Sequence, residues 1–236
     1  MFFFIVTLGL ESIQAQAPAN DARYAFGKKI FQFFKEQKID LIIGAIDPKA
    51  QDNVKQSIST SILNGMEKLK TIGDPARMKI INVLVVNSRN KLLIPVLTDK
   101  NDIIMIILDN VINRGGVLFL AGPVHVVRSE KEKRLTQARK VYMAKCFSCH
   151  GQYGEGMVGP NLTDDYWKYA KTDAEVKDVI ANGRKGTVMI AFKDYLSAQE
   201  INDLMLYISI LQGQRLRKGK PAEGNQVRLL RNLYLR

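Results

Sequence analysis

The sequence feature that most constrains this chain is the pentapeptide Cys146-Phe147-Ser148-Cys149-His150, which contains both of its cysteines. Two thiols separated by two residues and followed directly by a histidine form the pattern for covalent attachment of a haem group. The thiols add to the haem vinyl groups, and the adjacent imidazole reaches the iron. The pattern therefore predicts one covalent haem c, attached at Cys146 and Cys149, with His150 as an axial ligand.

A Cys-x-x-Cys pair can also be a thiol redox site, but such a site usually opens a helix after a strand. Here the pentapeptide follows a Lys-rich segment, residues 130–145, in which Leu135, Ala138 and Tyr142 recur at helical spacing. The motif thus closes a helix, and a glycine-rich loop at 151–160 follows it. This context favours haem attachment over thiol redox chemistry.

Two capping boxes predict further helices after the glycine-rich loop. Thr172 is followed three residues later by Glu175, and Ser197 is followed three residues later by Glu200. Each box precedes an apolar stripe at helical spacing. Together with the first helix they predict a small, mainly α haem domain over residues 129–212.

Several segments of the domain share the residues of one family. Residues 130–224 resemble the mono-haem domains of bacterial class I cytochromes c, and most of all the haem c domain of the cytochrome subunit of cbb-type haem-copper oxidases. The resemblance covers about 40% of the chain and is specific in several places at once. The matching segments are residues 146–151, 154–156, 159–167, 183–189, 196–201 and 219–224.

The resemblance implies a class I cytochrome c fold and a role for each matching residue. His150 would be the proximal iron ligand and Met189 the distal one. A thioether is a soft ligand that favours ferrous iron, so this pair of ligands would raise the reduction potential. The carbonyl of Pro160 would accept a hydrogen bond from the second ring nitrogen of His150 and fix the orientation of the ring. Leu162 would pack on the haem.

The resemblance also implies that Trp167 and Arg184 contact the haem edge or the propionates. Two residues compete with the predicted ligands. Met157 is a rival to Met189, but it lies too close to His150 in the sequence to reach the opposite haem face easily. His125 is the only other histidine, in a Val-rich segment where a structural role is more common.

The chain also departs from the family pattern. Ile190 follows Met189 where proline is usual, and Ala138 stands where glycine is common at the crossing of the first and last helices. The membrane anchor and the second haem motif of the oxidase subunit do not occur in the sequence. We therefore expect a relative of that domain in another setting rather than the oxidase subunit itself.

Residues 18–128 form an N-terminal domain whose function the sequence does not indicate. Periodicity predicts two helices and three stretches of β-strand, at residues 22–38, 51–70, 79–86, 91–97 and 117–127. These elements favour a small α/β domain.

A second interpretation of this region stays open. Three short segments, 27–31, 95–99 and 111–115, echo segments 138–142, 160–164 and 179–183 of the haem domain in the same order. The echoes suggest a degenerate, haem-less cytochrome-like domain, although short matches arise easily by chance.

The first 17 residues have the features of a signal peptide. Residues 2–10 are apolar, and Ala15-Gln16-Ala17 has the small-x-small form of a signal-peptidase site. The apolar run is too short to span a bilayer. We expect export to the periplasm or another extracytoplasmic compartment, where bacteria attach haem c, and peripheral membrane association if the segment is retained.

The net charge of +12 is unevenly distributed. Residues 18–128 carry 16 basic and 10 acidic side chains, residues 129–212 carry 12 and 11, and residues 213–236 carry 7 and 1. Excess positive charge steers docking to acidic protein surfaces or anionic lipid. Nucleic acid is a poor partner for an exported chain without aromatic residues among its basic ones. We expect acidic redox protein partners, and a basic C-terminal tail at 213–236 that docks on a partner.

These features predict that the chain transfers electrons through a single haem and is a subunit of a larger respiratory or oxidoreductase complex. The chain itself is expected to have no enzymatic activity of its own. Two alternatives stay open. A haem enzyme or gas sensor would leave the distal site open, and a scaffolding subunit would use the N-terminal domain for assembly and the haem only as an auxiliary group.

Overall fold

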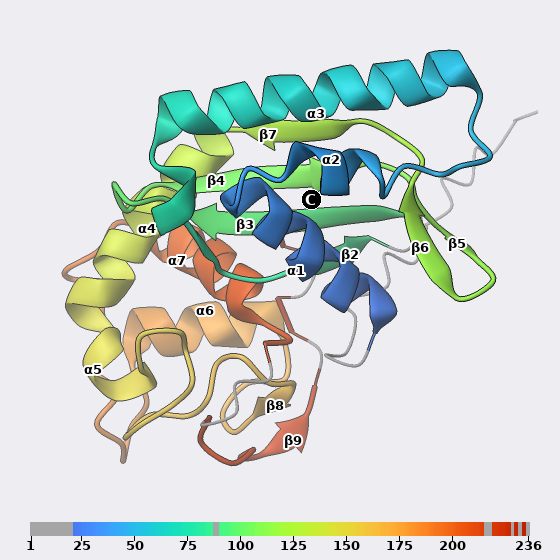
Figure 1. Ribbon diagram of the computed structural model, residues 1–236. Coiled ribbons are helices and arrows are strands. Elements are labelled where there is room, and N and C mark those ends of the chain that lie inside the picture. Colours follow the sequence, from blue (N-terminus) through green and yellow to red (C-terminus); the bar gives the residue numbers. More distant parts are fainter. Residues whose placement is uncertain (1–20, 87–89, 215–218, 228, 231–232, 235–236) are drawn as a thin grey trace, which may run out of the picture.

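The computed structural model describes residues 21–86, 90–214, 219–227, 229–230 and 233–234. The predicted signal peptide lies outside these residues. The described N-terminal region is a β-sheet with helices on one face, and the helices of the C-terminal region cover the other face (Figure 1). Within these ranges no helix combines the length and the apolarity that crossing a bilayer requires.

Three helices and a single 3-10 turn begin the described chain. They are α1 (Ala22–Lys35), α2 (Ile39–Ile43), α3 (Asp52–Ile72) and η1 (Pro75–Arg77). The Asp21 side chain caps α1 by accepting a hydrogen bond from the backbone N–H of Arg23 at 2.8 Å. The buried residues of α1 and α3 recur on one stripe of each helix and point towards the sheet.

The sheet has five antiparallel strands: β1 (Lys79–Ile80), β2 (Leu84–Val86), β3 (Lys91–Leu97), β4 (Ile103–Leu108) and β7 (Val124–Val127). β3 and β4 form its centre. β1 and β2 follow one another along the free edge of β3, and β7 pairs with β4 on the other side. A separate hairpin of β5 (Val111–Arg114) and β6 (Val117–Leu120) projects from the sheet.

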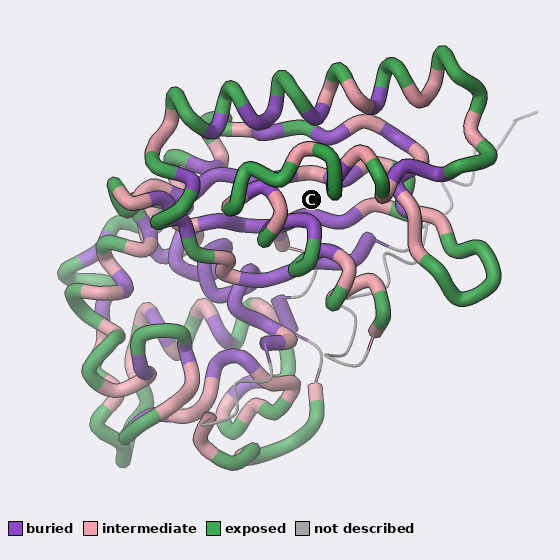
Figure 2. The backbone as a smooth tube through the Cα atoms, in the orientation of Figure 1, coloured by how far each residue is buried: buried purple, intermediate pink, exposed green. Residues whose placement is uncertain are grey.

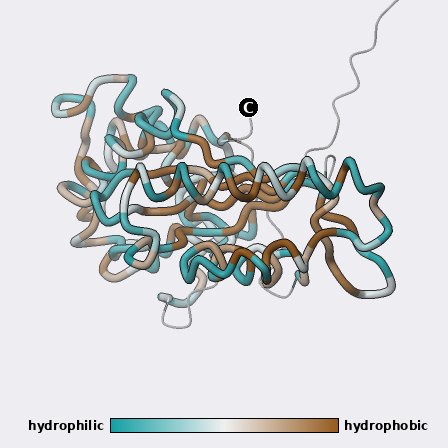
Figure 3. Tube along the Cα trace, turned by 45° about the horizontal axis from the view of Figure 1, so that its top comes forward, coloured by the Kyte–Doolittle hydropathy of each residue, from teal (hydrophilic) through white to brown (hydrophobic). Residues whose placement is uncertain are grey.

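Figure 2 shows buried residues along the strands of the sheet, and Figure 3 shows that these strands are largely hydrophobic; in β4 every residue except Ile107 is buried. Ile104 and Ile106 point into the core beneath α1 and α3, whereas Ile103 and Met105 point into the core shared with the C-terminal helices. Successive side chains of a strand point to opposite faces. The apolar strand β4 therefore contributes side chains to both cores.

The C-terminal region contains α4 (Glu130–Lys145), α5 (Phe147–His150), β8 (Tyr166–Trp167), α6 (Asp173–Asn182), α7 (Ala198–Leu211) and β9 (Asn225–Gln226). The predicted capping box is confirmed at α7, where Ser197 and Glu200 cap the helix reciprocally; at α6 only half of the predicted box is present, the Thr172 side chain accepting from the Glu175 N–H. α4 and α7 pack together, and the rings of Tyr142 and Tyr207 lie 5.3 Å apart. The predicted packing of the first and last helices of residues 129–212 against each other is confirmed.

Helix α7 joins the two regions. All of its residues from Ile201 to Leu211 except Asn202 are buried, because one side faces α4 and α6 and the other faces the sheet. Asn82, next to β2, donates hydrogen bonds to the carbonyls of Ile210 and Gln212 at 3.0 and 2.9 Å. These bonds satisfy carbonyls at the helix end, which have no partner within the helix.

The prediction of a mainly α chain is wrong for the N-terminal region, where the sheet forms the centre. The degenerate cytochrome interpretation is also wrong. Residues 111–114 form strand β5, whereas the segment they echo belongs to helix α6. The helix-and-sheet alternative agrees with the observed elements, although all sheet pairings are antiparallel, and residues 117–127 form two strands rather than one.

The C-terminal segment is not a free tail in its described part. Leu229, Leu230 and Tyr234 are buried in the core shared by the two regions. The hydroxyl of Tyr234 donates a hydrogen bond of 2.5 Å to the carboxylate of Glu132 near the start of α4. These three apolar side chains therefore belong to a core of this chain, and docking of the basic tail on a partner stays a prediction.

Candidate functional site

The two cysteines and the histidine of the motif lie on one short helical segment. α4 ends at Lys145, Cys146 connects it to α5, and the backbone N–H of His150 donates to the carbonyl of Cys146 at 2.9 Å. Gly151, at φ +82°, ends α5 in a conformation that favours glycine. This turn brings Cys146, Cys149 and His150 to the wall of a single cavity.

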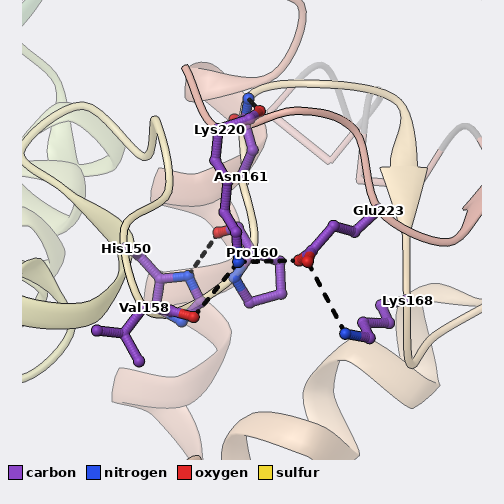
Figure 4. Close-up of polar contacts among 7 residues, drawn as sticks. All are labelled: His150, Val158, Pro160, Asn161, Lys168, Lys220 and Glu223. Carbon is purple, nitrogen blue, oxygen red and sulfur yellow. Dashed lines mark hydrogen bonds and ion pairs between the residues drawn. The ribbon is translucent and has the colours of Figure 1, made fainter. Parts of the chain in front are cut away.

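The His150 ring is held by the glycine-rich loop. Its Nδ1–H donates to the carbonyl of Pro160 at 2.9 Å, and since a carbonyl can only accept, this contact fixes the tautomer (Figure 4). A Cβ at Gly159 would lie 2.8 Å from Cε1 of the ring, so only glycine leaves room for it. Burial lowers the pKa of His150, which favours the neutral imidazole that binds metals through its second nitrogen.

The cavity has a volume of about 380 Å³ and lies between α5, the glycine-rich loop, β8, α6 and α7. This size falls in the usual range for sites that bind small molecules or cofactors. Seven of the eight predicted site residues line it: Cys146, Cys149, His150, Pro160, Leu162, Trp167 and Met189. The structure thus brings together residues that are spread over 44 positions of the sequence.

Met189 lies on a loop, residues 183–189, that is held by hydrogen bonds between its own residues. The backbone N–H of Arg184 donates to the Met189 carbonyl at 2.9 Å, and the Met189 N–H donates to the Thr187 hydroxyl at 3.1 Å. Gly183, at φ +69°, lets this loop approach, because a Cβ there would lie 2.7 Å from the Met189 carbonyl oxygen. The thioether is therefore held at the cavity wall by a compact loop.

Arg184 is the predicted site residue that does not line the cavity. Its guanidinium lies over the ring of Tyr169, 5.1 Å from the ring centre, and Tyr169 does line the cavity. Neither rival ligand lines it. Met157 is 58% exposed, and His125 lies on β7, where its Nε2 is 3.2 Å from an oxygen of Asp109.

The residues of the cavity fit a covalently attached haem. They provide two thiols, a neutral imidazole and a thioether, on walls that are mostly apolar. The indole Nε1 of Trp167 is buried at the cavity and has no hydrogen-bond partner in the described part of the chain. A buried N–H without a partner is costly, and a carboxylate of a bound cofactor would satisfy it.

Cys146 does not have the lowered pKa of a redox-active thiol. Both cysteines are free thiols, and burial raises the pKa of Cys146 to about 11. Redox-active thiols instead have a lowered pKa, because the thiolate is the reactive form. The environment of Cys146 therefore agrees with attachment of an apolar cofactor.

Four residues at the site were not predicted from the sequence. The hydroxyl of Tyr142 on α4 donates to the carbonyl of Gly151 at 2.8 Å and ties the first helix to the end of the motif. Tyr169 lines the cavity and supports Arg184. Lys220 and Glu223 reach the wall from the C-terminal segment. Tyr142 had a sequence signal in its place on the apolar stripe of residues 130–145, and Lys220 and Glu223 had one in segment 219–224, which resembles the family.

A family model described as subunit III of cbb3-type cytochrome c oxidase matches residues 133–208. A cbb3-type cytochrome c oxidase subunit FixP of Bradyrhizobium diazoefficiens is 35% identical over 80 residues, which cover 33% of this chain and 27% of that protein. A subunit CcoP of the same oxidase type, from Azospirillum sp., is 33% identical over 102 residues, which cover 38% and 34%.

The solved structure of cytochrome cL from Hyphomicrobium denitrificans is also similar, with 32% identity over 34% of this chain and 48% of that chain, and a TM-score of 0.31. The chain spans about a third or less of the length of the FixP and CcoP relatives, and the similarity is confined to one region. The N-terminal region lies outside the segment that the family model matches.

Proposed function

Because residues 133–208 form a cytochrome c domain of the cbb3 type, we propose that this chain carries one covalently bound haem c and transfers single electrons. Cys146 and Cys149 would hold the haem, and His150 and Met189 would be its axial ligands. The observation that carries the proposal is the gathering of these four side chains on one cavity of suitable size. When bound, a haem supplies a one-electron couple at its iron.

The residues of the chain would hold and tune that couple. The Pro160 carbonyl keeps the His150 ring in one orientation and makes it a stronger ligand, since it accepts the Nδ1 proton. Leu162 and the apolar wall exclude water. Trp167 Nε1 would donate to a haem propionate, and Arg184 would support that edge through Tyr169.

We further propose that the chain works as a subunit of a larger oxidoreductase complex in the periplasm or another extracytoplasmic compartment. Its relatives FixP and CcoP are named as subunits of a cbb3-type oxidase. The net charge of +12 suits redox partners with acidic docking surfaces. A peripheral contact with an anionic membrane has the same electrostatic basis.

The test is to produce the full chain in cells that attach haem c and to examine the purified protein. We expect one haem per chain that survives denaturation, the near-infrared band of Met-ligated ferric haem, and no carbon monoxide binding to the ferrous form. Two haems, or none, would overturn the proposed cofactor. One covalent haem that binds carbon monoxide readily would instead support a haem enzyme or gas sensor with an open distal site.

A further inference from the structure

The C-terminal segment 219–227 lies along the loop that holds His150 (Figure 4). The backbone N–H of Lys220 donates to the Glu155 carbonyl at 2.7 Å, and the Asn161 side-chain amide donates to the Lys220 carbonyl at 3.2 Å. The Lys220 ammonium reaches the Val158 carbonyl at 3.4 Å. One residue therefore contacts the loop on both sides of Pro160.

The close approach of this segment depends on glycine. Gly156 has φ +82°, and a Cβ there would lie 2.9 Å from Cβ of Lys220. From the other side, the same loop is bonded to the haem motif: the N–H groups of Gly156 and Gly159 donate to the carbonyls of His150 and Cys149, both at 2.8 Å. The loop is thus held between the motif and the C-terminal segment.

Glu223 connects the segment to Lys168, which directly follows β8. Its carboxylate lies 3.1 Å from the ammonium of Lys220 and 3.8 Å from that of Lys168. All three residues line the cavity, and the side chains of Lys220 and Glu223 are only 27% and 30% exposed. Partly buried charges are screened less by solvent than exposed ones.

A short strand pairing completes the attachment. β9 pairs with β8, and the N–H of Val227 donates to the Asp165 carbonyl at 2.7 Å. Gly224 has φ +95°, and a Cβ there would lie 2.4 Å from the carbonyl oxygen of Trp167. Any larger residue at position 224 would have to move the segment away from β8.

We propose that residues 219–227 form a clamp that positions the proximal loop and through it the His150 ring, with Lys220 as its positioning residue. The inference rests on the proposed function in treating His150 as an iron ligand. The physical link is short: the clamp holds residues 155–161, this loop carries the Pro160 carbonyl, and that carbonyl orients the ring. The Lys220 ammonium on the cavity wall also favours the reduced, less positive state of a bound haem.

The first test is hydrogen exchange of residues 151–162 in full-length Gly224→Ala, which should detach the clamp. Losing the clamp's hydrogen bonds should accelerate exchange of this loop about tenfold, with no change in α3. Gly116→Ala is the matched control, since Gly116 has φ +86° but nothing within 4 Å of an added Cβ. Unchanged exchange of residues 151–162 in Gly224→Ala would overturn the clamp. So would equal acceleration throughout α4 and α7.

The second test uses the haem-loaded protein and does not depend on whether Gly224→Ala folds. Lys220→Met should shift the redox equilibrium about threefold towards the ferric form, because a nearby positive charge is lost. It should also accelerate exchange of the His150 Nδ1 proton. Lys220→Arg should preserve both properties, as should Lys140→Met, which removes an exposed lysine of α4. Equal shifts in Lys220→Met and Lys140→Met would contradict the role of Lys220.

The two tests separate this inference from the proposed function. A wild-type chain without covalent haem would overturn the proposed function. Exchange of residues 151–162 requires no haem and would still decide whether the clamp holds the loop.

Discussion

The N-terminal region and the haem domain build their interiors in opposite ways. In the N-terminal region, β3 and β4 are hydrogen-bonded along both edges, and the side chains of α1 and α3 fill the core above them. In the haem domain, the chain between α5 and α7 contains one helix, α6, and the two-residue strand β8. The rest consists of loops around a cavity of about 380 Å³.

From this difference we expect the loops around the cavity to depend more on a bound group than the core of the N-terminal region does. A filled core is stabilised by its own buried apolar surface. Loops around a cavity lack those contacts on one side, and a bound group stabilises the state that binds it. The two regions nevertheless share a core on the face of the sheet opposite α1 and α3, so the sheet packs directly against the C-terminal helices.

The strongest test of this comparison removes the attachment sites. Cys146→Ser combined with Cys149→Ser should abolish covalent haem, as measured by haem staining after denaturation. Hydrogen exchange in residues 151–196 should become about a hundredfold faster, because ligand stabilisation is lost, while α3 and β3 keep their protection. Ser148→Ala, within the same motif, should retain the haem. Equal loss of protection in both regions would break the comparison.

The next largest effect concerns the loop that closes the cavity. Met189→Ala should keep the covalent haem but lose the near-infrared band, bind carbon monoxide and have a lower reduction potential, because a soft axial ligand is removed. Met157→Ala is the control, since that side chain is 58% exposed and does not line the cavity. Loss of the band in Met157→Ala instead would show that the distal ligand is misassigned.

Substitutions at adjacent residues of β4 can show whether the two cores unfold independently. Ile104→Ala and Met105→Ala should each lower the free energy of unfolding by about 2–4 kcal/mol, because both side chains are fully buried. The two variants should differ in where amide hydrogen exchange becomes faster: in α3 for Ile104→Ala, and in α7 for Met105→Ala. If the two variants gave identical exchange patterns, the two cores would unfold as one unit.

The smallest effect is expected at the hydrogen bonds from Asn82 to the end of α7, which connect the two regions. Asn82→Ala leaves the carbonyls of Ile210 and Gln212 without their buried donor, which should cost about 1–3 kcal/mol in urea denaturation. Asn182→Ala is the control, because its amide bonds Asp178 at an exposed position and should cost less than about 0.5 kcal/mol. A negligible effect of Asn82→Ala would mean that packing alone joins the regions.

Much of the fold could be predicted from local patterns. The bounds of α4 and β3 agree with the periodicity of the sequence, and the caps at Thr172 and Ser197 begin α6 and α7. Strand β4 was missed, although it lies at the centre of the sheet. A strand buried on both faces shows no alternation of apolar and polar residues, so residues 103–108 displayed only an apolar run.

The sequence predicted most residues of the candidate site but not all of them. Seven of the eight named residues line the cavity, because the motif and the segments that resemble class I cytochromes carry them in fixed order. Arg184 does not line the cavity itself but lies over Tyr169, which does, so its contact with the haem edge stays a prediction. Lys220 and Glu223 lie in segment 219–224, which resembles the family, but their place at the cavity was not predicted, because a single lysine and glutamate in a basic tail usually indicate a solvated segment.

The sequence by itself determined the predicted chemistry of the motif, because the two thiols and the imidazole lie within five residues and need only one helical turn to meet. Only the tertiary structure decided what surrounds them. Apolar periodicity indicates that a residue is buried but not what covers it, since the hydrophobic effect is not directional. The sheet behind α7 and the return of residues 219–227 to the His150 loop therefore emerged only from contacts between distant parts of the chain.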